Sequence, residues 1–265
     1  MKKIILLLCT LLTINTSVMS KPVDIEYNDG IYHITLNGEK IKKKIKFVTS
    51  EHLITNKEAH QKGNAKLTIN AGFFDPENEK TISYIVTDGQ ISADPLFNEN
   101  LWMGGKYSRK SLDMIMNRTE FRVVRCGNKL HYEITPHKAD IEFGCELLTS
   151  AQGGPLILPT LRLEEEFFIV KKDGEVIRES ASVLHKTART VIGLKDGVAH
   201  ILIITDKNPM DMYEVQALCK KMGFDRAMAF DGGSSTSMNY LDKIEVTSNS
   251  DGGGRNLKSF MIISK

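Results

Sequence analysis

Short apolar or alternating segments, separated by turn dipeptides, make up most of this chain. An Asp or Asn followed by Gly supplies the positive φ angles that a two-residue type I′ hairpin turn needs. Five such pairs lie between segments with strand character, and we expect a hairpin at each of them: Asp29-Gly30, Asn37-Gly38, Asp88-Gly89, Asp173-Gly174 and Asp196-Gly197. The nearly unbroken apolar run from Val198 to Ile204 predicts a strand buried on both faces. The pattern therefore favours a fold dominated by strands.

Apolar residues at helical spacing are less frequent. One stripe predicts a helix over residues 212–222. Asp211 and Glu214 have the spacing of an N-terminal capping box, and Gly223 stands where a left-handed C-terminal residue belongs. Because this helix separates two apolar strands, we expect a parallel crossover there. A second helix is expected over Glu51 to Gln61.

No internal repeat, low-complexity tract or proline-rich linker divides the chain. We therefore predict one α+β domain over residues 21–265, built on a strand-rich mixed sheet with several hairpins and a few flanking helices. Residues 21–64 form a candidate small amino-terminal β extension of this domain.

The first twenty residues have the three-part build of a secretory signal peptide. Two lysines precede an apolar run from Ile4 to Leu12, and a polar stretch ends at Ser20. The apolar run is far shorter than the roughly 20 residues that span a bilayer. We expect cleavage after Ser20, export to the periplasm or the medium, and no stable membrane anchor.

Composition narrows the classes of partner. Apolar residues make up 41% of the chain, enough to fill a core, and 35 basic side chains against 33 acidic ones give a net charge of +2. No cluster of Lys and Arg alternates with aromatic residues, so nucleic acid is not an expected partner.

The cysteines predict one disulfide bond. Cys126 and Cys145 flank residues 129–134, which have strand character, and export would place both in an oxidising compartment. A bridge that closes a loop of this size contributes roughly 3 kcal/mol. Cys219 lies on the apolar stripe of the predicted helix, and we interpret it as a buried thiol. No CxxC motif or Cys/His spacing indicates a zinc site.

The first candidate site follows the short apolar strand at residues 227–230. Asp231 ends this strand and is followed by Gly232, Gly233, Ser234 and Ser235. Ligands of open sheets bind at strand ends. Glycines allow the backbone to approach a ligand, and free N–H groups in such a turn can bind an anion. The loop therefore suits a phosphate or a sugar, and the alternative is a tight turn in which Asp231 caps its own loop.

Other strand ends carry similar groups. After the apolar residues 67–69, an amide, two aromatic rings and a carboxylate gather around a glycine, a combination that suits a sugar ring but also a partly buried core segment: Asn70, Gly72, Phe73, Phe74 and Asp75. Gly153 and Gly154 precede another apolar run and equally fit an ordinary glycine turn.

Two arginines and one further carboxylate complete the candidates. Arg189 and Thr190 begin an apolar strand, where an arginine either binds phosphate or forms a structural ion pair. Arg255 follows a glycine-rich loop, and Asp206 ends the strand at residues 201–205. The motifs of dinucleotide-binding, P-loop, zinc-protease and α/β-hydrolase proteins are absent from the chain.

Four of these segments, taken in order, resemble the phosphodiester glycosidase domain. They are the segments of residues 70–75, 153–155, 188–193 and 230–238, and the resemblance spans about residues 65–265. Ala71 stands where many members of this family have a second glycine. The resemblance implies a hydrolase that cleaves a glycosidic bond to phosphate, and it carries Asn70, Arg189, Asp231 and the two serines of the Asp231 loop onto the site.

In the mechanism we expect, the phosphate is stabilised by Arg189, Arg255 and the N–H groups of the Asp231 loop. Asp231 activates water or stabilises the sugar cation, with Asp206 or Asp75 as its partner. Two alternatives stay open. In the first, the pocket only binds a glycan or phosphoglycan; in the second, Asp231, Asp206 or Asp251 holds a divalent cation.

Overall fold

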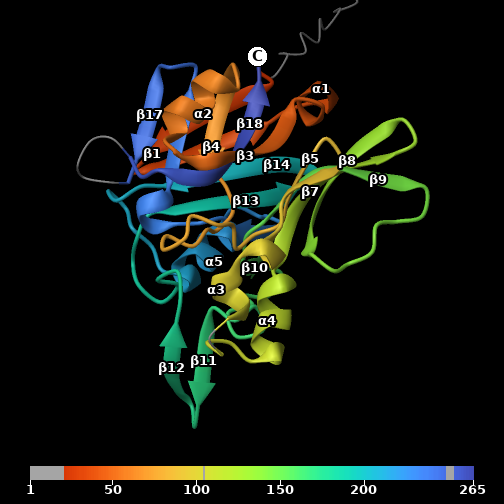
Figure 1. The fold of residues 1–265 in the computed structure, drawn as a ribbon. Helices are drawn as coiled ribbons and strands as arrows, with labels where there is room; N and C mark the ends of the chain where they lie inside the picture. Colours follow the sequence, from red (N-terminus) through yellow and green to blue (C-terminus); the bar gives the residue numbers. More distant parts are fainter. Residues whose placement is uncertain (1–20, 104, 249–253) are drawn as a thin grey trace, which may run out of the picture.

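The computed structural model describes residues 21–103, 105–248 and 254–265 (Figure 1). The predicted signal peptide and Asp251 lie outside the described residues. Three sheets and a separate hairpin form the fold, and every described pair of neighbouring strands is antiparallel. The predicted strand-rich α+β class is confirmed, but the expected mixed sheet is not, because the described sheets are purely antiparallel.

The first sheet has six strands and includes the first two strands of the chain. Its order is β1 (Val23–Asn28), β2 (Ile31–Leu36), β14 (Val198–Ile204), β13 (Arg189–Lys195), β15 (Arg226–Ala229) and β10 (Leu156–Leu158). Residues 201–204 of β14 are fully buried, as the apolar run predicts. Because β2 pairs with β14 along its whole length, the amino-terminal hairpin is part of this sheet.

Helix α5 (Met212–Lys221) connects β14 to β15. Both strands pair antiparallel with β13, which lies between them, so they run parallel to each other. The expected parallel crossover is therefore present, but β13 lies between the two strands that it connects. The capping box of Asp211 and Glu214 is formed, and Gly223 has a φ of 73°.

Two five-stranded sheets complete the framework. One has the order β17 (Ile244–Thr247), β16 (Ser237–Tyr240), β4 (Ala65–Asn70), β18 (Leu257–Ser264) and β3 (Ile45–Ile54). The other has the order β6 (Gln90–Ala93), β5 (Ile85–Thr87), β9 (Cys145–Gln152), β7 (Thr119–Cys126) and β8 (Lys129–Pro136). The bridge between Cys126 and Cys145, predicted from the sequence, is present and joins directly opposed residues of β7 and β9.

The remaining elements are short. The helices are α1 (Glu39–Lys42), α2 (Asn56–Lys62), α3 (Glu99–Trp102) and α4 (Arg109–Met116), with 3₁₀ turns η1 (Pro95–Phe97) and η2 (Gly233–Ser235). The hairpin of β11 (Ile169–Lys172) and β12 (Glu175–Glu179) projects away from the sheets, next to α4 (Figure 1). No helix in the described part of the chain is long and apolar enough to cross a membrane.

Two local predictions need correction. Four of the five turn dipeptides connect hairpins, but Asn37-Gly38 does not, because Gly38 precedes α1. The second helix begins at Asn56 rather than Glu51, since Glu51 to Ile54 extend β3. Thr55 marks the true start, because it forms a capping box with Glu58.

The core fills the space between the sheets and fixes the end of β15. The Phe230 ring packs on Phe47 with 5.8 Å between ring centroids, and Phe47 packs in turn on Phe121. All three rings are buried. Because Phe230 immediately precedes Asp231, this packing anchors the beginning of the Asp231 loop.

Candidate active site

The Asp231 loop, residues 231–236, is held at several points by main-chain hydrogen bonds. The Asp231 N–H donates to the Ala71 carbonyl at 3.0 Å, and the Gly233 N–H donates to the Ala188 carbonyl at 2.8 Å. Gly233 has a φ of 59°, in the left-handed region that glycine adopts without strain. The loop is therefore fixed against the ends of β4 and β13.

Asn70 is a buried hub behind this loop. Its side-chain Nδ2 donates to the Asp231 carbonyl at 2.6 Å. Its Oδ1 accepts from the Thr190 hydroxyl at 2.7 Å and from the Ser237 N–H at 3.0 Å. Both polar atoms of the amide are thus engaged within the protein, and Asn70 ties three segments to the loop.

Arg189 is likewise engaged within the protein. The residue is 1% exposed, and its guanidinium donates to four main-chain carbonyls. These belong to Met210, Ala181, Ser182 and His185, at distances between 2.6 and 3.2 Å. The geometry favours a structural role for Arg189 over the phosphate-binding role expected from the sequence, because these hydrogen bonds occupy four of its five N–H donors.

The Asp231 carboxyl group faces a different environment. Burial raises its pKa to about 6, although the Ser235 hydroxyl, the Arg255 charge, the Gly232 N–H and the Arg189 charge all act to lower it. The Gly232 N–H donates to Asp231 Oδ1 at 3.0 Å. Perturbed carboxyl groups in clefts are candidates for catalysis.

The Asp231 side chain lines a cavity of about 190 Å³. Its wall is formed chiefly by four aromatic rings and two arginines, namely Phe73, Phe74, Tyr107, Phe168, Arg118 and Arg178. Asp231 is the one acidic residue in the described part of this wall. Of the residues predicted for the site, Phe73, Phe74 and Asp231 line this cavity together.

Arg118 and Arg178 place two cations in the wall. Arg118 lies with Cζ 4.0 Å from the Phe168 ring centroid, and Arg178 lies 4.3 Å from that of Phe167. Arg118 donates to the carbonyls of Glu166 at 2.9 Å and Phe167 at 3.4 Å, and Arg178 donates to the Phe167 carbonyl at 3.0 Å. Burial lowers the pKa of Arg118 to about 10, which the Glu166 carboxylate opposes and the nearby Arg178 reinforces. Arg118 therefore remains a cation at neutral pH.

Arg255 approaches the same loop from β18. Its guanidinium lies 4.9 Å from the Phe74 ring centroid and donates to the Ser234 hydroxyl at 3.2 Å. Arg255 is partly exposed, and its charge acts to lower the pKa of the Asp231 carboxyl.

The predicted glycines serve close packing. A Cβ at Gly72 would lie 2.6 Å from the Ser83 side chain, and one at Gly153 would lie 2.5 Å from the Ala229 carbonyl. Gly154 has a φ of 102°, and a Cβ there would lie 2.3 Å from the Glu166 carboxylate. These positions require glycine because other protein atoms approach the backbone, not because a ligand must.

Most of the N–H donors of the anion-binding turn expected in the Asp231 loop already form hydrogen bonds within the protein. The N–H groups of Gly232, Gly233, Ser235 and Thr236 all donate to acceptors of the protein. A phosphate bound at this loop would therefore compete with existing hydrogen bonds, and Arg118 and Arg178 are better placed cations for the cavity.

Asp75 and Asp206 lie apart from the cavity of Asp231. Asp75 accepts from the Glu77 N–H at 2.9 Å within its own turn and from the side-chain amide of Asn100 in α3 at 3.0 Å. Asp206 is exposed and lines a different depression, with Tyr27 and Tyr32. This separation argues against a cation held jointly by Asp206 and Asp231.

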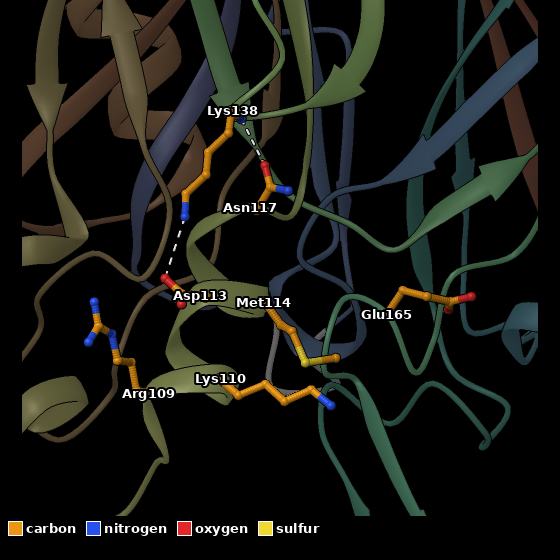
Figure 2. Close-up of a pocket in the computed structure, with 7 residues that line it drawn as sticks. All are labelled: Arg109, Lys110, Asp113, Met114, Asn117, Lys138 and Glu165. Atoms are coloured by element: carbon orange, nitrogen blue, oxygen red, sulfur yellow. Dashed lines mark hydrogen bonds and ion pairs between the residues drawn. The ribbon is translucent and has the colours of Figure 1, made fainter.

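A larger depression, of about 600 Å³, lies on the outer face of α4 (Figure 2). It contains none of the residues predicted for the site. Lys138 crosses it to Asp113, with 3.5 Å between Nζ and Oδ1, and the Lys138 N–H donates to Asn117 Oδ1 at 2.8 Å. Its charged groups are thus exposed and partly paired, whereas Asp231 is only partly exposed and lines a smaller cavity.

The arginines of the wall carry no sequence signal that would have identified them. Arg118 stands between α4 and β7, and Arg178 lies in the projecting hairpin, each without a glycine-rich or polar motif beside it. Only the fold brings them, with Tyr107 and Phe168, to the cavity of Asp231.

Comparisons with known proteins agree with this architecture. The catalytic domain of zebrafish N-acetylglucosamine-1-phosphodiester alpha-N-acetylglucosaminidase, auto-inhibited by its pro-peptide, matches with a TM-score of 0.64 and 13% identity. The match covers 92% of this chain and 81% of that one. At this identity the likeness shows a shared fold.

Two bacterial structures match in the same way. A candidate exported protein from Burkholderia pseudomallei has a TM-score of 0.63 and 12% identity, over 89% of this chain and 74% of that one. A protein from Synechocystis has a TM-score of 0.57 and 12% identity, over 91% of this chain and 61% of that one. No curated protein matches the chain in sequence.

The sequence pattern of the phosphodiester glycosidase family matches residues 63–264, from just before β4 to the end of β18. This range contains the Asp231 loop, its buried supports and the whole cavity wall. The chain therefore belongs to the phosphodiester glycosidase family.

Proposed function

We propose that this protein hydrolyses the bond between a sugar and a phosphate in a sugar phosphodiester or an envelope phosphoglycan, and that the cavity of Asp231 is its active site. The observation that carries the proposal is the wall of this cavity, where one carboxyl group of raised pKa faces aromatic rings and two arginines. A phosphodiester glycosidase must stabilise positive charge on the sugar and negative charge on the leaving phosphate, and this wall has groups of both kinds.

Asp231 acts on the sugar side. With a pKa of about 6 it is ionised at pH 7, yet basic enough to accept a proton from water. The water oxygen forms a bond to the anomeric carbon, and the bond between that carbon and the phosphate oxygen breaks. The electron pair of the broken bond stays on the phosphate oxygen and leaves with the phosphate monoester. The carboxylate also stabilises the positive charge that develops on the sugar ring.

Arg118 and Arg178 act on the phosphate side. The guanidinium of Arg118 lies over the Phe168 ring and that of Arg178 over the Phe167 ring. Hydrogen bonds from arginine to a phosphate are among the stronger contacts a protein can make. Because a phosphate monoester is a good leaving group, charge stabilisation by these arginines replaces the second carboxyl group of an ordinary glycosidase.

The aromatic rings bind the sugar. A volume of about 190 Å³ equals that of roughly six liquid waters, which limits the cavity to about one sugar unit. The Phe73 and Phe168 rings lie 5.7 Å apart and offer an apolar surface to a sugar ring. Asn70 and Arg189 are positioning residues in this proposal, since they hold the loop that carries Asp231.

The experiment uses the mature chain with a sugar-nucleotide phosphodiester and measures release of the free sugar. Asp231→Asn is expected to abolish turnover, whereas Asp206→Asn and Asp75→Asn are expected to retain it. Release of sugar by Asp231→Asn at the wild-type rate would overturn the assignment.

The same experiment distinguishes catalysis from binding. Saturable binding of phosphoglycan by the wild-type chain, without release of sugar or phosphate monoester, would instead support an envelope glycan-binding protein. Turnover that persists after treatment with a chelator supports the metal-independent mechanism given above.

A further inference from the structure

A depression of about 480 Å³ lies next to the cavity of Asp231. The cavity has a volume of about 190 Å³ and holds about one sugar unit, so the depression has room for about two. Its wall combines an aromatic ring with two lysines, two acids and hydroxyl groups, among them Phe97, Lys80, Lys258, Glu51, Asp94 and Ser50. This mixture of an apolar ring and small polar groups resembles the lining that a carbohydrate needs.

One turn of the chain separates this depression from the cavity. Thr81 lines the depression, and the next residue, Ile82, lines the cavity. Thr81 also forms a β-bridge with Phe74, another residue of the cavity wall. A glycan chain that passes over the turn of residues 74–81 would therefore occupy both places at once.

Phe97 presents an exposed ring on a backbone that is held firmly. The residue is 77% exposed, whereas Pro95 and Asn98, on either side of it, are buried. The Asn98 N–H donates to the Pro95 carbonyl at 3.0 Å, and the Asn98 side chain donates to the Thr81 carbonyl at 3.1 Å. The short turn that carries the ring is thus fixed to the boundary between the depression and the cavity. An apolar ring fixed in this way can cover the C–H face of a sugar at a low cost in conformational entropy.

The charges around Phe97 favour a neutral sugar over a phosphate. Lys80 forms an ion pair with Glu99, which neutralises its charge. This leaves Lys258 against the two carboxylates of Glu51 and Asp94. Carboxylates accept hydrogen bonds from sugar hydroxyls and repel an anion. Lys258 donates to the Glu51 carbonyl at 2.7 Å, and its ammonium group has further N–H donors for a hydroxyl oxygen.

We propose that this depression, named here the Phe97 depression, binds neutral sugar units of the glycan chain whose bond to phosphate is hydrolysed in the cavity. The inference rests on the proposed function for the identity of that chain, and it makes the substrate an extended phosphoglycan rather than a small sugar phosphodiester. The Phe97 ring covers the apolar face of a sugar unit, and the carboxylates of Glu51 and Asp94 accept from its hydroxyls. Because the two places bind one chain together, the affinity for a polymer exceeds that for a single unit.

The test is calorimetry of the mature chain with three neutral tetrasaccharides, namely cellotetraose, maltotetraose and chitotetraose. We expect saturable binding of at least one of them, and Phe97→Ala should raise its Kd by about tenfold, the upper value for an aromatic contact. Phe97→Tyr keeps the ring and should keep the Kd within about twofold of the wild-type value. Phe143→Ala is the matched control and should leave the Kd unchanged, because Phe143 is fully exposed in the loop between β8 and β9.

An acidic oligosaccharide tests the preference for neutral sugars. Tetragalacturonate, which carries a carboxylate on each unit, should bind more weakly than the neutral tetrasaccharides. Tighter binding of tetragalacturonate would assign the depression to anions and overturn the proposal. Failure of all three neutral tetrasaccharides to bind the wild-type chain would also overturn it, as would equal binding by Phe97→Ala.

The same measurements separate this inference from the proposed function. Binding that depends on Phe97, in a chain that releases no sugar from a phosphodiester, would support the Phe97 depression and contradict the proposed hydrolysis. Release of sugar by a chain that binds no neutral tetrasaccharide would support the hydrolysis and contradict the inference.

Discussion

Two regions meet at Asp231, and they use arginine in opposite ways. Behind the loop, Arg189 directs its hydrogen bonds to four main-chain carbonyls and cannot easily release them. In front of the loop, Arg118 and Arg178 lie over aromatic rings and line the cavity. The comparison teaches that an arginine beside a catalytic candidate can be part of the scaffold, and that its hydrogen-bond partners decide which role it has. The predictions below test this division, from the largest expected effect to the smallest.

The largest effect is expected from a change at the Asp231 carboxyl group, which both regions surround. Asp231→Asn should lower kcat/KM for a sugar phosphodiester by about 10²- to 10⁴-fold, the usual contribution of a positioned general base. The measurement is sugar release by the purified variant, with circular dichroism as the control for folding. A loss below tenfold would place the essential carboxylate elsewhere.

Arg189→Met should act on stability. Removing the guanidinium leaves four carbonyls without their donor, and each buried unsatisfied group costs about 1–3 kcal/mol. We expect the free energy of unfolding to fall by about 3 kcal/mol or more in a urea titration. Binding of phosphate-containing sugars and of neutral sugars should weaken to the same extent. A selective loss of affinity for the phosphate-containing sugars would instead support the phosphate-binding role of Arg189.

Arg118→Gln should act on binding instead. The variant loses a cation of the cavity wall, and a hydrogen bond to a charged group contributes about 1.5–3 kcal/mol. We expect the Kd of a sugar phosphate to rise by about 10- to 100-fold by calorimetry, while that of the neutral sugar changes little. An equal rise for both ligands would assign Arg118 to the scaffold with Arg189.

The smallest effect is a gain in stability. Burial holds the Asp231 pKa at about 6, above the ordinary aspartate value of 3.8, so ionisation costs the folded state free energy at neutral pH. Because the cavity reaches solvent, we expect Asp231→Asn to stabilise the protein by about 1–2 kcal/mol at pH 7.

The pH dependence of this gain is its control. The advantage of Asn should be complete above about pH 7 and should decline as the pH falls through 6, and it should vanish below about pH 3, where the wild-type carboxyl is protonated in both folded and unfolded chains. Thermal unfolding of both proteins across this range measures it. A gain that does not change with pH would have a cause other than the carboxyl charge.

Local features of the fold could be predicted because neighbouring residues determine them. Asp29-Gly30 and three similar pairs form hairpins since their backbone angles favour such turns, and the α5 capping box follows from two side chains three residues apart. Asn37-Gly38 and the start of α2 were predicted wrongly, because the same local signals permit more than one element and pairing of β3 with β18 decides the outcome.

The sequence by itself determined the strand-rich fold and the Cys126–Cys145 bridge, and it indicated the loop at Asp231 as a candidate site. Only the tertiary structure decided which side chains face that aspartate and which lie beside its cavity. Arg118 and Arg178 reach the cavity, and Phe97 and Lys258 reach the depression next to it, from separate segments of the chain. The physical reason is that turns and strands depend on neighbouring residues, whereas the direction of a side chain depends on strand register and packing.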